Sequence, residues 1–452
     1  MSKLFALEDI DGGVEGEELE ASPEVGEVAD AETDIVEDAS DISETTGAVD
    51  DGLGASEDLE QVENVVADSE EEGGLTPVAA EAIRIAVESI CHRVGANPKT
   101  VYSLYATENF KSASSRKANT SIALEGIGSF LKDLWAKIKA ALKNLWDKAT
   151  AFFDKHLSSL GRVKKALESA KSKLSDSSGK IKGEAYLDEA PSSLATAFGS
   201  KDDVSVAVIN KYIANHAALF NTVYRINDKS AKQAETAAST PEKSDEEKIK
   251  ELINGANEKY ELGTQPAPLV GGIYITYTIT GDREEGTIEV DIDRETVDSS
   301  SDKAGLTVAG KSDVLSLINN TLKVINDTIK LRDKFYKANE NCNKALNEMG
   351  KTIERLAVST ESISFALERN KNKNKNKNNN NNNNNNSNNA DNSGSDNANE
   401  SGIDIKVARK CLRIMYKIQS KLPTINQEIF VLNVKLAKAV LGYTAVCLKH
   451  YK

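Results

Sequence analysis

The sequence predicts a mainly α-helical fold: an elongated helical bundle with one β-hairpin, a disordered acidic N-terminal leader and a disordered Asn-rich insertion. Three observations lead to this prediction. Long segments carry apolar residues at spacings of three and four, which is the period of one helix face. A single pair of neighbouring segments alternates like β-strands. Gly (28) and Pro (8) are few among 452 residues, which favours long unbroken helices.

Charge divides the chain into two unequal parts. Residues 1–125 hold 30 acidic and 7 basic residues, a net charge of −23, and residues 126–452 hold 41 acidic and 49 basic residues, a net charge of +8. The first 75 residues contain 26 acids and one base, Lys3. Self-repulsion and the small apolar content predict that residues 1–75 are disordered. The simpler interpretation is an acidic tail that only keeps the protein in solution.

Residues 76–125 are expected to complete this N-terminal segment with one helix. That helix begins where Thr76 precedes Pro77, because Pro is favoured at the first position of a helix. A looser Ser-, Ala- and Lys-rich stretch is expected to follow, up to Ser121.

A basic amphipathic helix over residues 126–157 gives the strongest periodic signal in the chain. Its apolar face consists of Phe130, Leu131, Leu134, Trp135, Ile138, Leu142, Leu145, Trp146, Phe152 and Phe153. Lysines border this face. A core helix of the bundle would bury the apolar face and keep the lysine tips in water. A membrane-active helix lying in the lipid interface has the same pattern. The core helix is favoured, since every core-facing helix needs such a face.

The remaining segments complete a helical body over residues 126–368. A β-hairpin is predicted at about residues 273–293, where two alternating β-branched segments flank a polar loop. Residues 369–401, with nine consecutive Asn at 378–386, are expected to form a disordered linker. Residues 402–452 are expected to form a helical hairpin, broken at Pro423, that packs on the body.

Recognisable catalytic motifs are missing from the sequence. It contains no nucleotide-binding Gly-rich loop, no HExxH and no GxSxG. The four His and four Cys are scattered without metal-ligand spacing. We therefore expect no catalytic residues, no cofactor, no metal and no enzymatic activity. No signal peptide and no membrane-spanning segment is expected either, so the protein is predicted to be made and kept in a cytoplasm.

A short motif lies where the charge balance changes sign. Residues 121–128 read SIALEGIG, in which Ala123, Leu124 and Glu125 precede Gly126; a similar motif, Ala106, Thr107 and Glu108, lies upstream. The acidic leader, this junction and the Lys/Ala-rich helical body resemble the internal head proteins of large tailed phages, notably the phiKZ-like jumbo phages. The resemblance implies a propeptide that the phage prohead protease removes after a Glu preceded, two residues earlier, by a small or aliphatic residue.

Glu125 is the first candidate for the cleavage position, and Glu108 is the second. The Ser-rich stretch upstream of Glu125 is expected to be flexible, and a Gly follows it. Cleavage after Glu125 would change the net charge of the chain from −15 to +8.

The resemblance implies a virion structural protein of the head interior, matured from a precursor in the host cytoplasm. Its expected partners are the prohead protease and other head or scaffold proteins. The mature body would be packaged with the genome, in weak sequence-independent contact with DNA, and ejection with the genome is left open. One alternative is an unprocessed helical scaffold or adaptor with an acidic solubilising tail. The other is a membrane-active effector that uses the 126–157 helix.

Overall fold

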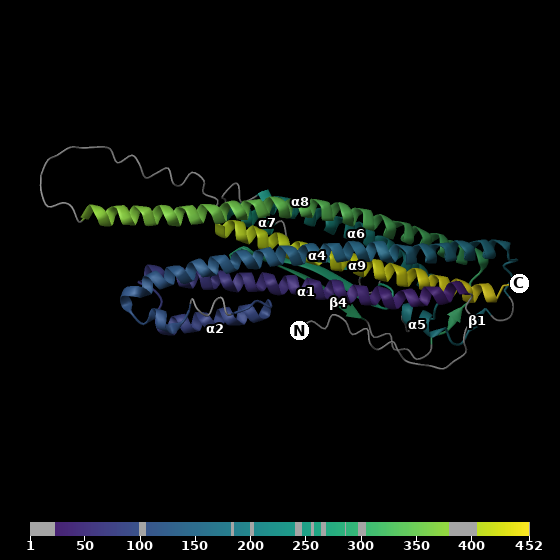
Figure 1. Cartoon of the computed structure of the whole chain (residues 1–452). Coiled ribbons are helices and arrows are strands. Elements are labelled where there is room, and N and C mark those ends of the chain that lie inside the picture. The colour runs from purple at the N-terminus through teal and green to yellow at the C-terminus, as the bar shows by residue number, and fades with distance from the viewer. Residues whose placement is uncertain are drawn as a thin grey trace.

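The computed structural model describes residues 23–98, 105–181, 185–198, 203–239, 246–254, 257–263, 268–284, 286–296, 304–378 and 405–451. They form an elongated bundle of long helices with a small sheet on one side, which confirms the predicted mainly α fold (Figure 1). The long helices are α1 (Pro23–Glu71), α4 (Ala113–Asp176), α6 (Val206–Ser239), α8 (Lys311–Asn378) and α9 (Ile405–Lys449). Shorter helices are α2 (Pro77–Arg93), η2 (Thr107–Phe110), α5 (Ser192–Phe198) and α7 (Glu246–Asn254).

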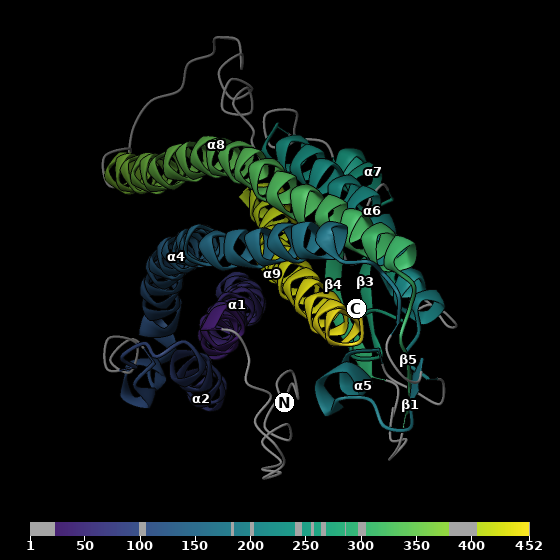
Figure 2. The ribbon, with the colours of Figure 1, turned by 90° about the vertical axis from the view of Figure 1, so that its right-hand side faces the viewer.

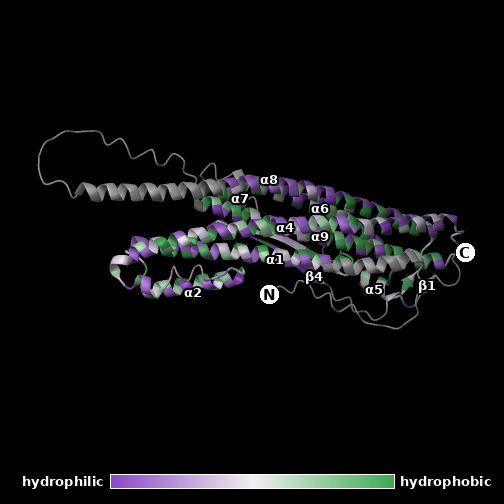
Figure 3. Cartoon of the chain, viewed as in Figure 1, coloured by the Kyte–Doolittle hydropathy of each residue, from purple (hydrophilic) through white to green (hydrophobic). Residues whose placement is uncertain are grey.

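Helix α9 lies at the centre of the bundle. It contacts α1, α4, α5, α6, α7, α8 and β4, and Figure 2 shows it enclosed by these elements. Hydrophobic and hydrophilic stripes alternate along the surrounding helices (Figure 3). By length and composition alone, Val407–Lys449 could cross a membrane, but 67% of its most apolar window is buried in the bundle. A helix at the centre of a protein core is expected to have this composition.

The predicted break of the C-terminal segment at Pro423 is wrong. Helix α9 continues through Pro423 as one element. Proline inside a helix removes one backbone hydrogen bond and costs about 3 kcal/mol. Residues 422–427 are all buried against neighbouring helices, and this tertiary packing holds the segment helical in spite of that cost.

The predicted disorder of the leader is also wrong for residues 23–71, which form α1; residues 1–22 lie outside the described residues. Helix α1 packs on α4, α9 and α2. Where burial is described, its buried apolar side chains are Ile35, Ala39, Ile42, Val49, Leu53, Ala55, Leu59 and Val66. In proteins, helices obtain most of their stability from packing against other elements. The composition of residues 1–75 does not show which elements this segment packs on, so it did not predict the helix.

Helix α4 joins segments that we predicted to be separate. It runs unbroken from Ala113 to Asp176 and therefore includes the stretch expected to be loose. Of the ten residues on its predicted apolar face, nine are buried and Phe130 is partly buried. Trp146 stacks on Phe335 of α8 with ring centroids 4.8 Å apart, and Phe153 meets Phe430 of α9 at 5.5 Å. This face could reach a membrane only if α4 left the bundle.

The predicted hairpin is confirmed as β3 (Ile273–Asp282) and β4 (Thr287–Thr296). A third strand, β2 (Glu258–Leu262), adds to β3 and gives an antiparallel sheet in the order β2-β3-β4. The sequence pattern predicted only the hairpin, so this third strand was missed. Two short strands, β1 (Tyr186–Leu187) and β5 (Leu306–Thr307), form a separate pair. The sheet packs on α9 through β4.

Helix α8 extends beyond the predicted start of the Asn-rich linker. It ends at Asn378 rather than at residue 368, and residues 379–401 of the predicted linker lie outside the described residues.

A buried histidine joins three parts of the core. His216 of α6 donates from Nδ1 to Oδ1 of Asn433 in α9 at 2.8 Å, and its Nε2 accepts from the backbone N–H of Val270 at 3.1 Å. Burial lowers the pKa of His216 to about 4. The imidazole is therefore neutral at pH 7 and acts as a structural hydrogen-bonding group.

Two glycines of α1 differ in their surroundings and provide a test of its packing. A Cβ on Gly52 would lie 2.9 Å from Cγ1 of Ile138 in α4, whereas a Cβ on Gly47 would meet nothing within 4 Å. We predict that Gly47→Ala stabilises the protein by about 1 kcal/mol through helix propensity. The same change at Gly52 should lose this gain, because Ile138 must move. Chemical denaturation followed by circular dichroism measures both; equal gains would contradict the close approach of α1 to α4.

Candidate functional site

The preferred cleavage motif lies inside a long helix. Ala123 is buried, and its carbonyl oxygen accepts a hydrogen bond from the hydroxyl of Tyr105 at 3.4 Å. Glu125 is exposed, and Gly126 is half-buried. The reason given for preferring Glu125, a flexible segment upstream, is wrong because residues 113–122 belong to α4. A protease would have to open several helical turns to bind this motif.

The second motif lies between two longer helices. Ala106 precedes η2, a single 3₁₀ turn in which Glu108 is exposed. Two short-range backbone bonds hold this turn, from Asn109 N to Ala106 O at 2.9 Å and from Lys111 N to Glu108 O at 3.5 Å. Three side chains of α4 add to them: Arg116 donates to Phe110 O, and Ser115 and Asn119 donate to Asn109 O. Opening it breaks fewer hydrogen bonds than opening α4, so Glu108 is the more accessible of the two positions.

A row of ion pairs joins α1 to α9, and sequence reasoning missed it. Four carboxylates of α1, which we call the acidic face, meet four cations of α9, which we call the basic stripe. The acidic face is Asp50, Glu57, Glu60 and Glu63, and the basic stripe is Arg409, Arg413, Lys417 and Lys421. The two helices run antiparallel, since Glu63 pairs with Arg409 and Asp50 pairs with Lys421. The available signal was the opposite charge of the two segments, but nothing in the sequence gives the register.

The centre of this interface is largely desolvated. Arg413 Nη2 lies 2.6 Å from Glu60 Oε2 and its Nη1 lies 3.8 Å from Glu57 Oε1; the Arg413 side chain is 6% exposed and that of Glu60 is 18% exposed. Burial raises the pKa of Glu60 in spite of the nearby Arg413 and Arg409. Within the described residues, Glu60 Oε1 and Arg413 Nε have no hydrogen-bond partner. Such a pair fixes the register of α1 but returns little net stability, because both charges are taken out of water.

A second charged contact holds the other end of α1 on α4. Asp38 lies between Lys155 and His156, whose nitrogens are 2.8 Å and 2.7 Å from its Oδ2. Partial burial of Asp38 acts to raise its pKa, but the hydrogen bonds from Lys155 and His156 prevail and hold that pKa below its usual value. Carboxylates of α1 thus contact both α4 and α9.

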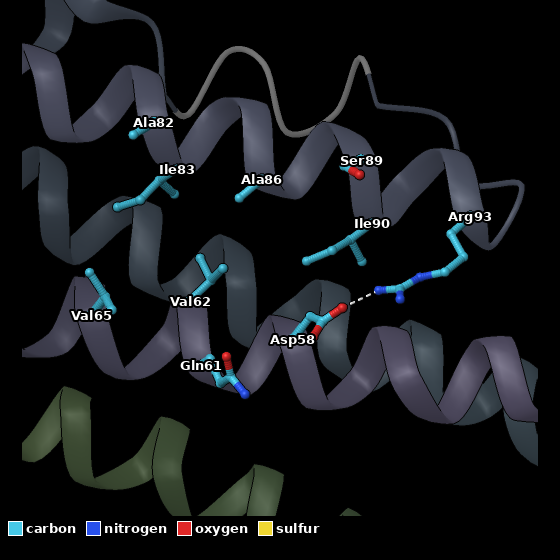
Figure 4. Close-up of a pocket in the computed structure, with 10 residues that line it drawn as sticks. All are labelled: Asp58, Gln61, Val62, Val65, Ala82, Ile83, Ala86, Ser89, Ile90 and Arg93. Atoms are coloured by element: carbon cyan, nitrogen blue, oxygen red, sulfur yellow. Dashed lines mark hydrogen bonds and ion pairs between the residues drawn. The ribbon is translucent and has the colours of Figure 1, made fainter.

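A shallow groove between α1 and α2 offers no reactive chemistry (Figure 4). Its wall is mostly apolar or small side chains, such as Val62, Ala86 and Ile90, and an ion pair between Asp58 and Arg93 lies at one end. In the part of the chain that the structure describes, no group of His, Cys, Asp and Glu could hold a metal ion. The four cysteines are buried free thiols.

A family model of phiKZ-like phage internal head proteins matches residues 21–390. The chain belongs to this family. This internal head protein is therefore a structural component of the virion head interior, assembled in the host cytoplasm together with other head components. The match includes α1, so the acidic helix is part of what the family model describes. No curated protein and no solved structure matches the chain.

Proposed function

We propose that this internal head protein is made as a precursor, that the prohead protease removes its acidic N-terminal segment, and that the mature body is packaged beside the genome and can leave the head with it. The observation that carries the proposal is the position of the charge. The leader helices α1 and α2 precede η2, and residues 1–108 hold 29 acids and 4 bases, a net charge of −25. Their removal leaves a body with a net charge of +10.

The two charge states suit different stages of head assembly. The acidic precursor is repelled by nucleic acid and can associate with basic surfaces of other head proteins. The positive body neutralises DNA phosphates by releasing their counterions, which requires no sequence recognition. Cleavage after Glu125 gives nearly the same result, with a net charge of +8.

Glu108 is the first cleavage position in this proposal and Glu125 is the second. Cleavage after Glu108 leaves α4 and all later elements whole. Cleavage after Glu125 requires part of α4 to unfold and removes the residues that precede Gly126 from that helix. This order reverses the one based on sequence alone.

N-terminal sequencing and intact-mass measurement of the protein from purified particles test the proposal. We expect a mature chain that begins at Asn109. A mature chain that begins at Gly126 would support removal of the leader but would place the cleavage after Glu125 instead of Glu108. In phage carrying Glu108→Gln the leader should persist, whereas the matched change Glu125→Gln should leave processing intact. Full-length protein in mature heads would overturn the proposal and leave an unprocessed scaffold protein.

A further inference from the structure

We infer that the basic stripe of α9 is a contact site for double-stranded DNA, and that α1 covers this site until the leader is removed. The inference rests on the proposed function for the step that removes α1. The surface and its cover are properties of the folded chain and can be tested without that step.

The spacing of the basic stripe suits a phosphate backbone. Its four cations recur at every fourth residue of one helix, so neighbouring cations are about 6 Å apart and the whole stripe is about 18 Å long. One DNA strand carries a phosphate about every 3.4 Å along the helix axis, so the stripe spans about five phosphates. Arg409 and Arg413 supply planar guanidinium groups. One such group can donate two parallel hydrogen bonds to two oxygens of a single phosphate.

In the uncut chain, the carboxylates of α1 occupy the positions that phosphates would take. The acidic face runs along the stripe, and each of the four cations pairs with at least one carboxylate of α1. The stripe side chains are between 6% and 23% exposed. A DNA duplex cannot reach them while α1 is in place, so the precursor is closed to DNA at this surface.

Helix α1 has the properties of a removable cover. It contains 18 acidic residues and no basic residue, so its neighbouring carboxylates repel one another when the helix is isolated. Gly47, Gly52 and Gly54 lower its helix propensity further. Its central pair, Glu60 with Arg413, is incompletely hydrogen-bonded. Cutting the chain also removes the high effective concentration that keeps α1 docked.

DNA fits the stripe better than an acidic helix of another protein. The family places the chain inside the head, where the packaged genome is the most abundant polyanion. The mature body carries net positive charge, which supports binding to any long polyanion. The experiment below separates the two ligands.

The test compares full-length, uncut proteins, so it does not depend on processing in the particle. The interface variant carries Asp50→Asn, Glu57→Gln, Glu60→Gln and Glu63→Gln. These changes leave the four cations of the stripe buried without counter-charges, so α1 detaches from α9 and exposes the stripe. The matched surface variant carries Asp41→Asn, Glu44→Gln, Asp51→Asn and Asp68→Asn, four exposed positions of the same helix. Both variants have the same net charge. Fluorescence anisotropy measures binding of a short labelled duplex over a range of salt concentrations, and circular dichroism checks the fold.

We expect only the interface variant to bind the duplex through four additional phosphate contacts. Its affinity should fall roughly 100-fold between about 50 and 200 mM salt, with a logarithmic slope of about −3.6. Adding Arg409→Gln, Arg413→Gln, Lys417→Gln and Lys421→Gln should abolish this binding. Four lysines exposed on α4 and α8, changed together as Lys132→Gln, Lys143→Gln, Lys165→Gln and Lys323→Gln, are the matched control and should leave the slope unchanged.

Equal binding by the interface and surface variants would overturn the inference, because net charge alone would then explain the affinity. Binding of a peptide with the α1 sequence, but not of the duplex, would also overturn it and assign the stripe to an acidic helix. If the interface variant unfolds, the milder pair Glu57→Gln with Glu63→Gln is compared with Asp51→Asn with Asp68→Asn. The expected difference in slope is then about 2.

If the leader stays on the mature protein but the interface variant binds DNA, the proposed processing fails and the surface inference stands. If the leader is removed in the particle but the interface variant does not bind DNA, the proposed processing stands and the inference about the basic stripe fails.

Discussion

Replacing Trp146 with alanine is expected to lower the free energy of unfolding by about 3–5 kcal/mol, since the change leaves a large cavity in the core. Trp146 is 1% exposed and stacks on Phe335, which also contacts Phe153. The side chain therefore joins α4 to α8 through an aromatic cluster that includes Phe430 of α9. Chemical denaturation followed by circular dichroism measures the loss.

The conservative change Trp146→Phe is the matched control. Within the described residues, the indole Nε1–H of Trp146 has no hydrogen-bond acceptor. Phenylalanine removes this buried donor while keeping an aromatic ring, so the two effects partly cancel and a loss of about 1 kcal/mol is expected. A loss below about 1 kcal/mol for the alanine variant would contradict the packing of α4 on α8.

Replacing Arg413 with methionine is expected to destabilise the protein by about 3–5 kcal/mol. The change leaves Glu60 buried beside α9 without its main counter-charge, although Arg409 remains nearby. Amide hydrogen exchange should become faster throughout α1, because the pair of Glu60 with Arg413 fixes how α1 docks on α9. Chemical denaturation gives the total loss, and hydrogen exchange shows where the protein opens.

The double variant Arg413→Met with Glu60→Leu should recover most of that stability, because neither charge is then buried alone. The exposed pair Lys344 and Glu340 provides the control: Lys344→Met should cost less than about 0.5 kcal/mol. If the double variant were as unstable as the sum of its two single changes, the pair would not interact as the structure indicates.

The sequence correctly predicted the elements whose own apolar residues recur at the spacing of a helix or a strand. The face of α4 that contains Trp135 and Trp146 recurs at helical spacing, and the β3–β4 hairpin alternates strictly around a polar turn. Neither prediction needs knowledge of a distant segment, because each element contains its own period. The mainly α fold follows from elements of this kind.

Elements that depend on a distant partner were predicted wrongly. Helix α1 is too acidic to be a stable helix alone, and it forms where α9 supplies four cations and α4 supplies an apolar surface. Pro423 remains helical because the surrounding elements hold it in place. The candidate cleavage position changed for the same reason: the Ser-rich stretch before Glu125 looks loose in sequence but is the first part of α4.

The partners of the α1–α9 interface are separated by a long interval during synthesis. Glu60 and Arg413 are 353 residues apart. Ribosomes add about 5–20 residues per second, so Glu60 is made roughly 20–70 s before Arg413. During this interval the carboxylates of the acidic face lack their partners on α9, and α9 then joins helices that have already been made. Closure of the core and covering of the basic stripe are thus one late event, so the stripe is covered as soon as it has been made.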